Sequence, residues 1–400
     1  MDFKRLLINV PFVYSLNIMV KAALTKQSYN SLYSHYKKKA QKHDIVCHRG
    51  YAVDLIKRRL GKRGVKVQPV PKGKLRIFWI GANYAQDSSG IIQGLQDFGE
   101  VVLFESRPGK YEQIWPRGAD SRVAREENSR QLIAQVDKAL KSGPIHVVIG
   151  QMWPHVLDPL ALQTIRSKGI VVVNMSMDDR HVFRGRKVNG VRSGTSGLIP
   201  VIDLACTAAK ECCLWYMVEG CPSIYLPEAS DPKLFRPLSG PKLYDVCFVG
   251  ANYGIRTRIV KAIEKQGIKV TCYGRGWPNG FIETEKIPEL FARSRIVLGV
   301  GTIGHCTDFY SLKMRDFDGP MSGSLYLTHH NPDLEELFVV GKEIETYRSP
   351  EECAVKVRYY IDNPDKADAI GKAGRARAER EHTWEKRFEV LLKTIGLLEV

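Results

Sequence analysis

Residues 75–84 read LRIFWIGANY, and residues 244–253 read YDVCFVGANY. Each stretch is a short apolar run that stops at a glycine and continues into the same Gly-Ala-Asn-Tyr loop. This pattern is typical of a buried parallel strand whose carboxyl end opens into a loop. Unless the match is a coincidence, the chain begins the same structural unit twice, 169 residues apart.

The segments after the two loops favour duplication over coincidence. After the second loop, GIRTRIVKAIEKQG predicts a helix that ends at Gly267, and IKVTCYG predicts the next strand. After the first loop, SGIIQGLQDFG predicts a helix that ends at Gly99, followed by the strand EVVLFES. Helix-length and strand-length patterns keep alternating from residue 74 onward. The sequence therefore predicts an α/β protein with two tandem Rossmann-like domains.

Composition and turn signals divide the chain into four segments. Its 400 residues, 44% hydrophobic and 26% charged, suffice for two domains with cores of their own. The proline-rich stretch SDPKLFRPLSGPK is typical of a linker. We expect a basic, largely helical N-terminal extension over residues 1–73, a first Rossmann-like domain over 74–235 and a second over 236–380. Residues 381–400 are expected to form a closing helix that crosses back toward the first domain.

The net charge of +17 is concentrated in the N-terminal extension. Residues 1–72 hold 16 Lys or Arg against three acids, a net charge of +13. Their apolar part, RLLINVPFVYSLNIMVKAAL, is interrupted by Pro11 and Lys21 and does not reach the roughly 20 apolar residues of a membrane span.

The extension also carries a helical tyrosine stripe, formed by Tyr29, Tyr33 and Tyr36, ahead of KKKAQK and KRRLGKRGVK. The stripe suits either an anionic membrane surface or packing on the main body with a solvated basic face. No base-reading module is visible, which argues against nucleic acid as a partner.

The nine cysteines contain no C-x-x-C pair, and no His/Asp cluster indicates a metal. Reduced thiols and a cytoplasmic protein, peripheral on a membrane if the extension binds lipid, are the expectation.

The stretch richest in candidate chemistry is SLKMRDFDGPMSGSLYLT, residues 311–328. Lys313 and Arg315 could neutralise a diphosphate, and the Asp318 carboxylate could accept hydrogen bonds from ribose hydroxyls. Gly323 would let the backbone approach a ligand closely. The carboxyl ends of parallel strands are where such folds bind ligands, so this stretch predicts a nucleotide site in the second domain.

From about residue 242 to its end, the chain resembles group 1 glycosyltransferases, and within them the spore-maturation (CgeB-like) branch. The resemblance rests on FVGANYGIRTRIV, CYGRGWP, LKMRDFDGPMSGSLYLT, PDLEELFVVGKEIETYRSPEE and REHTWEKRF. The first domain resembles the family more loosely, through its strand order, NMSMDD and LPEASDPKLFRP.

The resemblance implies a GT-B fold, with a nucleotide-sugar donor held by the second domain and an acceptor, glycan or lipid-linked, by the first. No cofactor is implied, because the nucleotide sugar is a substrate. The diphosphate would lie on Arg256, Lys313 and Arg315, and the ribose on Asp318. Two further pairs complete the implied donor site: Ser322 and Gly323 as the phosphate-facing turn, and Gly250 and Asn252 lining the cleft.

The sequence departs from this family at one position that bears on catalysis. Many group 1 enzymes carry two glutamates eight positions apart, and with Asp318 as the second, the first falls on Tyr310. The nearest upstream acid is Asp308. The contact to the donor sugar and the stereochemical outcome are therefore left open.

Asp178 and Asp179 follow the predicted strand IVVVNMSM, where an acceptor-side residue would lie. They could supply a general base for the acceptor hydroxyl, or they could form a helix cap or a salt-bridged pair. GVGTIG, residues 299–304, has the spacing of a dinucleotide-binding motif but the wrong context, so it is interpreted as a loop. Trp277 is interpreted as a buried anchor of its loop, in preference to a platform on which a base or sugar stacks.

These features predict a glycosyltransferase that moves a sugar from a nucleotide sugar to an acceptor hydroxyl. Two alternatives remain open. The first is a protein of the same fold that binds a nucleotide or a membrane without catalysis, and the second is a nucleotide-sugar epimerase.

Overall fold

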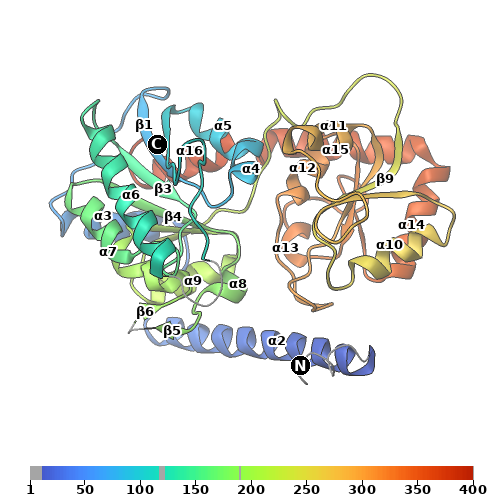
Figure 1. The fold of residues 1–400 in the computed structure, drawn as a ribbon, viewed down its shortest axis with the longest axis horizontal. Coiled ribbons are helices and arrows are strands. Elements are labelled where there is room, and N and C mark those ends of the chain that lie inside the picture. Colours follow the sequence, from blue (N-terminus) through green and yellow to red (C-terminus); the bar gives the residue numbers. More distant parts are fainter. Residues whose placement is uncertain (1–10, 117–121, 189–190, 400) are drawn as a thin grey trace. The chain divides into compact units, whose positions relative to one another are not determined.

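The computed structural model describes residues 11–116, 122–188 and 191–399. The chain divides into two compact units, each with its own parallel sheet (Figure 1). The six-stranded unit consists of residues 35–231 and 382–400. The five-stranded unit consists of residues 1–34 and 232–381. The start of the apolar leader, residues 5–10, lies outside the described residues.

The sheet of the six-stranded unit is parallel throughout, in the order β2-β1-β3-β4-β7-β8. Its strands are β1 (Leu75–Ile80), β2 (Gly99–Leu103), β3 (Val147–Gly150), β4 (Val171–Ser176), β7 (Leu204–Thr207) and β8 (Ser223–Tyr225). The helices are α3 (Arg49–Gly61), α4 (Tyr84–Gln86), the π-helical η1 (Asp87–Ile91), α5 (Ile92–Gln96), α6 (Arg122–Leu140), α7 (Pro159–Ser167), α8 (Asp179–Val182), the 3-10 helix η2 (Thr195–Val201), α9 (Lys210–Val218) and α16 (Trp384–Thr394). A short antiparallel pair, β5 (Lys187–Val188) and β6 (Val191–Arg192), completes it.

The five-stranded unit repeats the arrangement with the order β10-β9-β11-β12-β13. Its strands are β9 (Tyr244–Val249), β10 (Val270–Tyr273), β11 (Ser294–Gly299), β12 (Leu325–His329) and β13 (Glu345–Tyr347). The helices are α10 (Arg256–Glu264), the 3-10 helix η3 (Thr284–Lys286), α11 (Ile287–Ala292), α12 (Arg315–Met321), α13 (Pro332–Glu335), α14 (Pro350–Asp362) and α15 (Pro364–Glu381). The long helix α2 (Pro11–Lys42) begins in this unit and continues past residue 34 into residues of the other.

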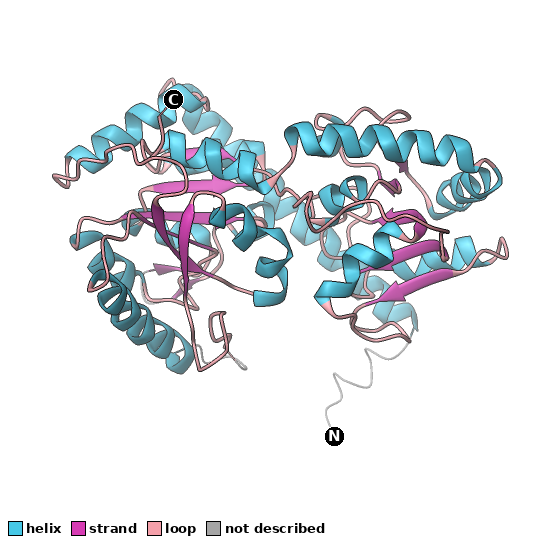
Figure 2. Cartoon of the chain, turned by 90° about the horizontal axis from the view of Figure 1, so that it is seen from above, coloured by secondary structure: helices cyan, strands magenta, loops and turns pink. Residues whose placement is uncertain are grey.

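The two strands that open the repeat occupy the same place in their sheets. β1 lies between β2 and β3, and β9 lies between β10 and β11, in each case with parallel pairing on both sides. In each unit the helices pack on the sheet, as Figure 2 shows. The predicted fold class, two Rossmann-like domains in tandem, is confirmed.

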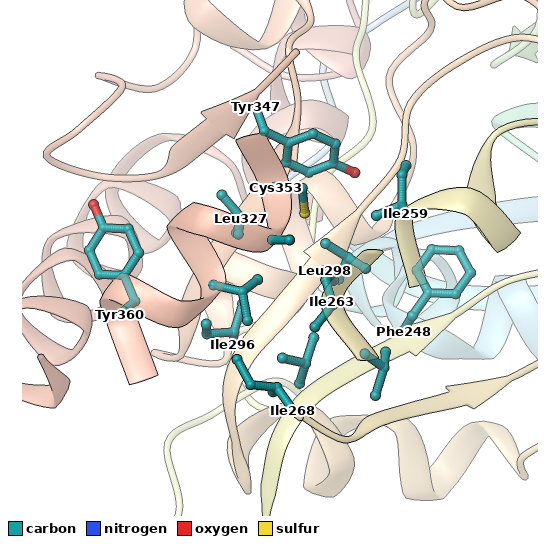
Figure 3. Close-up of a cluster of buried hydrophobic side chains, with 14 of the residues drawn as sticks. Phe248, Ile259, Ile263, Ile268, Ile296, Leu298, Leu327, Tyr347, Cys353 and Tyr360 are labelled. Atoms are coloured by element: carbon teal, nitrogen blue, oxygen red, sulfur yellow. The ribbon is translucent and has the colours of Figure 1, made fainter. Parts of the chain in front are cut away.

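Burial of apolar side chains accounts for the stability of both sheets. Every residue of β3 and β4 is buried, as expected of parallel strands covered on both faces. In the five-stranded unit, one face of the sheet packs against α10 and α14 through a cluster that includes Ile259, Ile263, Ile296 and Leu298 (Figure 3). Fully burying one such side chain contributes roughly 1.5–3 kcal/mol, so this cluster fixes the position of α10 on the sheet.

One predicted helix is broken, and a distant residue explains the break. Residues 89–99 were predicted as a single helix, but the chain kinks at Ser89 and at Gly90, which has φ +130°. A Cβ on Gly90 would lie 2.9 Å from Cδ1 of Trp384, and one on Gly94 would lie 2.5 Å from its Cβ. Close packing of α16 against this segment therefore sets the kink.

The tyrosine stripe of α2 is largely used in packing. In the five-stranded unit, Tyr29 lies 4.7 Å from Phe309 between ring centroids, in a small apolar cluster with Ala22. In the six-stranded unit, Tyr36 is buried, stacks on Trp215 and donates a hydrogen bond to Glu219 at 2.8 Å. The packing interpretation thus accounts for Tyr29 and Tyr36, while Tyr33 stays 40% exposed. Among the described residues, no helix combines the length and apolar character needed to cross a membrane.

Candidate functional site

The loop after β9 brings two arginines against one glycine. Gly250 has φ +153°, and a Cβ there would lie 2.8 Å from Nη2 of Arg315 and 3.4 Å from Nη1 of Arg256. Only glycine combines this backbone conformation with such a close approach of two guanidinium groups. The repeated loop therefore presents a cationic pair at the carboxyl end of a central strand, the edge at which open parallel sheets bind ligands.

Arg256, the first residue of α10, is buried and held from several sides. Its Nη1 donates to the Ala251 carbonyl at 2.6 Å and its Nη2 to the Tyr253 hydroxyl at 3.1 Å. The guanidinium also lies 4.0 Å from the centroid of the Tyr253 ring. Burial, and secondarily the charge of Arg315, lowers the pKa of Arg256 to about 10. The group remains charged at neutral pH, at an electrostatic cost that a bound anion would relieve.

Arg315, the first residue of α12, complements this position. Its guanidinium lies 5.1 Å from the centroid of the Phe248 ring, the same ring that Arg256 approaches to 5.4 Å. In the described part of the chain, neither arginine forms an ion pair with a carboxylate, and neither Nε atom has a hydrogen-bond partner. Two uncompensated guanidinium groups beside a glycine loop form a site for a multiply charged anion such as a diphosphate.

The turn that presents Lys313 and Arg315 is organised by Asp316, a residue that sequence reasoning did not select. Its carboxylate accepts a hydrogen bond from the Lys313 backbone N–H at 2.7 Å and another from the Tyr326 hydroxyl. Burial raises the pKa of Asp316. Lys313 is half-buried on this turn, and Asp318 is buried on the next part of α12.

Asn252 and Trp277 hold the glycine loop in place. Asn252 donates to the Gly276 carbonyl at 3.2 Å and accepts from the Thr257 hydroxyl at 2.5 Å. The Trp277 indole N–H donates to the Gly250 carbonyl at 2.8 Å, and its ring meets Phe248 edge-on. Both side chains therefore act on the conformation of the loop, in agreement with the interpretation of Trp277 as a loop anchor.

Ser322 and Gly323 are not brought together with the arginine pair. They follow α12 and precede β12, at the amino end of that strand, whereas Gly250 follows the carboxyl end of β9. A Cβ on Gly323 would lie 2.8 Å from Cγ of Pro237, so this glycine serves packing. A helix of seven residues spans about 10 Å, which separates its two ends. The structure thus gives no support to a phosphate-facing turn at these two residues.

The two aspartates after β4 differ in accessibility. Asp179 is 1% exposed and accepts hydrogen bonds from the hydroxyls of Ser176, Thr195 and Tyr216 at 2.8, 2.6 and 3.0 Å. Burial raises its pKa. Asp179 therefore ties β4 to η2 and α9, and its carboxylate is closed off from an acceptor. Asp178, at the N-cap position of α8, is half-buried and is the one of the pair that a ligand could reach.

The first copy of the repeat contains a carboxyl group that sequence reasoning missed. Asp87 occupies the position of Arg256, six residues after the glycine, and it is fully buried. It accepts hydrogen bonds from the Trp79 indole at 3.1 Å and from the Gln151 amide at 3.3 Å. Burial raises its pKa to about 7, with Glu112 adding to the shift. Extending the alignment of the two copies by three residues past the shared loop would have revealed it.

Comparison with solved structures defines the class of fold. A structure of Anabaena Alr3699/HepE in complex with UDP and glucose superposes with a TM-score of 0.57 at 12% identity, covering 81% of this chain and 100% of that one. A glycosyltransferase from Rickettsia africae gives a TM-score of 0.55 at 11% identity, covering 80% of this chain and 98% of that one. Sucrose-phosphate synthase from Thermosynechococcus elongatus gives 0.54 at 11% identity, covering 80% and 97%. At such identities the likeness establishes the fold, which is that of GT-B glycosyltransferases.

Sequence comparison adds a family match for part of the second half of the chain. Residues 256–393 match the family described as glycosyl transferase-like. No curated protein matches the chain in sequence. The matched segment begins at Arg256 and includes Lys313, Arg315 and Asp318, so it contains most of the candidate donor site. Fold and family match together support the predicted class, a nucleotide-sugar-dependent glycosyltransferase.

Proposed function

We propose that this protein transfers a sugar from a nucleotide-sugar donor to a hydroxyl group of an acceptor, and that the loop of Gly250 holds the donor diphosphate. The observation that carries the proposal is the pair of guanidinium groups, Arg256 and Arg315, that face this loop without a carboxylate partner among the described residues. Lys313 adds a third cation on the adjoining turn, and Asp318 is the proposed partner of the ribose hydroxyls.

In the proposed reaction, the main contribution of the five-stranded unit is electrostatic. In glycosyl transfer, the bond between the anomeric carbon and the diphosphate oxygen breaks, and the electron pair leaves with the diphosphate. Preorganised cations stabilise the charge that develops on this leaving group. A bond forms at the same time between the acceptor oxygen and the anomeric carbon, and the acceptor proton passes to a base or to the leaving phosphate. Asp178 is the proposed base if the configuration inverts.

The donor site is tested by nucleotide binding. Isothermal titration with UDP comes first, because UDP and glucose are named in the structure of a protein with this fold. Other nucleoside diphosphates follow. Arg256→Ala and Arg315→Ala should each weaken binding by about 10- to 100-fold, since a charge-assisted hydrogen bond contributes roughly 1.5–3 kcal/mol. Arg258→Ala removes an exposed arginine from the same helix and should change nothing. Equal affinity in all three variants would remove the arginine pair from the site.

The acceptor side is tested by turnover. Asp178→Asn should leave donor binding intact and lower transfer by roughly 10²- to 10⁴-fold, the usual contribution of a general base. The matched variant Asp179→Asn changes a buried carboxylate, so its effect should fall on the melting temperature. Transfer at the wild-type rate by Asp178→Asn would exclude Asp178 as the base and favour a retaining route.

A second candidate function is nucleotide binding without turnover, and one observation favours it. The position of the missing first glutamate is Tyr310, and the nearby Asp308 forms an ion pair with Lys26 of α2. This carboxylate is therefore engaged by the N-terminal extension. Nucleotide binding by a wild-type chain that transfers no sugar, and epimerises none, would decide for this candidate.

We also propose that the basic extension associates with the surface of an anionic membrane. Lys37, Lys38, Lys39 and Lys42 are exposed on α2, where each basic residue near such a surface contributes about 1 kcal/mol. Co-sedimentation with anionic vesicles should fall steeply as salt is raised, because these charges are screened within a Debye length of about 10 Å at 0.1 M. Protein that ignores anionic vesicles at low salt would contradict this proposal. Membership of the CgeB-like branch is likewise a proposal, supported by the motifs of the second half.

A further inference from the structure

Arg59 of α3 and Arg63, two residues after the helix ends, bind the amino ends of strands in the six-stranded unit. Arg59 donates to the carbonyls of Gly220, at 2.9 Å, and Ile199. Arg63 pairs with Asp203 at 2.7 Å and donates to the Ile170 carbonyl at 3.0 Å. These acceptors lie just before β8, β7 and β4. The helix is therefore fixed at the sheet edge opposite the carboxyl ends, on which Asp87 and Asp178 lie.

A large apolar groove runs along the other side of this helix. It has a volume of about 870 Å³, within the range of roughly 300–1,000 Å³ typical of small-molecule sites. The groove is bounded by α3, by residues 65–69 and by the end of α16. Its apolar lining includes Val53, Ile56, Leu60, Val67, Ile395 and Leu398.

A cationic hollow adjoins the apolar groove. It has a volume of about 470 Å³, and Val65 lines both cavities. The hollow is lined by Arg63, Lys66 and Arg166. Both arginines pair with the same buried carboxylate, Asp203, at 2.7 and 2.9 Å. One carboxylate cannot neutralise two guanidinium groups and an exposed ammonium, so the hollow carries net positive charge.

We propose that groove and hollow together form a site for an anionic phospholipid of a membrane, with one acyl chain in the groove and the phosphate in the hollow. The apolar lining matches the chain, and the excess cations match the phosphate. The rim of the groove mixes Arg49, Lys57 and Lys393 with Asp54 and Glu399, so it offers the headgroup no comparable excess of charge. The charge of +13 over residues 1–72 favours a bilayer as the source over free amphiphile.

This site is separate from the proposed transfer reaction. The hollow lies before the amino ends of β4 and β7, whereas Asp178 follows the carboxyl end of β4. The bound lipid is therefore an anchor and not the acceptor. Nucleotide binding by the five-stranded unit is expected to survive every variant used below.

The test of the groove uses Gly61, the last residue of α3. A Cβ built there meets no atom within 4 Å, and the residue lines the groove, so Gly61→Trp fills the cavity without a backbone clash. Binding of the full chain to vesicles of phosphatidylglycerol and phosphatidylcholine is measured by flotation at 0.1 M salt. Gly61→Trp should lower vesicle affinity at least tenfold. Gly61→Ala, which adds only the methyl group, should bind as the wild type does.

The test of the hollow uses a pair of charge reversals. Lys66→Glu should weaken binding to the same vesicles about tenfold or more, because it reverses a cation at the phosphate position. Lys110→Glu makes the same change in net charge on an exposed loop after β2, at the carboxyl edge of the sheet, and should lower affinity no more than about threefold.

Three results would overturn the proposal. If Gly61→Trp binds vesicles as the wild type does, or if the two charge reversals have equal effects, adhesion comes from net charge alone. If the wild type binds a monomeric anionic lysophospholipid but no vesicles, a bilayer lipid is not the ligand. Melting temperature and nucleotide affinity are measured for each variant, so loss of fold or of donor binding is not mistaken for loss of the lipid site.

Discussion

Residues 81–87 and residues 250–256 begin with the same Gly-Ala-Asn-Tyr sequence, follow equivalent strands and carry opposite charges. Both follow a central parallel strand, and both place a buried ionisable side chain six residues after the glycine, Asp87 in one and Arg256 in the other. Burial favours the neutral form of each group: it raises the pKa of Asp87 to about 7 and lowers the pKa of Arg256 to about 10.

The residue two positions before the glycine differs in step with the charge. Trp79 donates its indole N–H to the Asp87 carboxylate, whereas Phe248 offers its ring face to the Arg256 guanidinium. The comparison teaches that the repeated strand and loop can carry a buried anion or a buried cation, with a different aromatic residue, Trp79 or Phe248, beside each. Only the second loop, with its added Arg315, is suited to an anion.

The largest expected effect comes from giving the second loop the charge of the first. Arg256→Asp removes a cation from the proposed phosphate site and adds a repelling anion, so UDP affinity should fall by about 1,000-fold, or ~4 kcal/mol. Titration calorimetry measures it. Arg256→Lys should keep most of the affinity, and Arg258→Asp, the same reversal on an exposed position of α10, should keep nearly all. If Arg256→Asp binds UDP normally, the asymmetry between the loops has no role in ligand binding.

A smaller effect is expected from neutralising the first loop. The folded-state pKa of Asp87 is about 7 and its ordinary value is 3.8, so the folded protein binds the proton more tightly. Between these two values, stability should therefore fall as the pH rises, by at most about 4 kcal/mol.

Asp87→Asn should remove this dependence and raise the free energy of unfolding at pH 8 by about 2–4 kcal/mol relative to the wild type. Urea unfolding at pH 5 and pH 8 tests this. Asp54→Asn, at an exposed carboxyl, serves as the control. A wild type and an Asp87→Asn variant with parallel pH profiles would show that Asp87 titrates normally.

The smallest effect concerns the aromatic partner of the first loop. Trp79→Phe removes the N–H that favours the charged form of Asp87, so the pKa of Asp87 should rise further. Stability should drop by about 1–2 kcal/mol at pH 8 and by less at pH 5, where the carboxyl is protonated. Trp115→Phe is the control, since the Trp115 indole donates to a neutral carbonyl, that of Ala82, at 2.9 Å. Equal losses at both pH values would assign the Trp79 effect to packing alone.

The sequence predicted the fold because its signals are local. A buried parallel strand needs only an apolar run and a glycine, and both copies contain them within ten residues. The kink at Gly90 could not be predicted from the sequence, because its cause is packing against Trp384, almost 300 residues away along the chain. The sequence shows Arg59 of α3 and the following Arg63 only as part of a basic run, and nothing local indicates that they bind carbonyls before the amino ends of strands.

The candidate site was predicted in part for a related reason. The position of Arg315 upstream of Asp318 selected it, the family resemblance added Arg256, and their meeting at Gly250 follows from the topology of β9 and α12. Spacing could not reveal that α12 carries Ser322 and Gly323 to the other edge of the sheet, nor that three hydroxyl groups enclose Asp179. Accessibility of a carboxylate is a property of packing, which sequence patterns report only indirectly.

The discontinuity of the six-stranded unit has a consequence for biosynthesis. Residues 382–400 belong to that unit, and Trp384 packs on Gly90 and Gly94. A ribosome therefore delivers all of the five-stranded unit, up to residue 381, before it delivers α16. Domains generally fold as units during synthesis. The five-stranded unit, whose strands come second in the sequence, is thus the first that can finish folding. Until α16 is synthesised, the surface of the six-stranded unit that Trp384 covers stays exposed, and a chaperone could bind there.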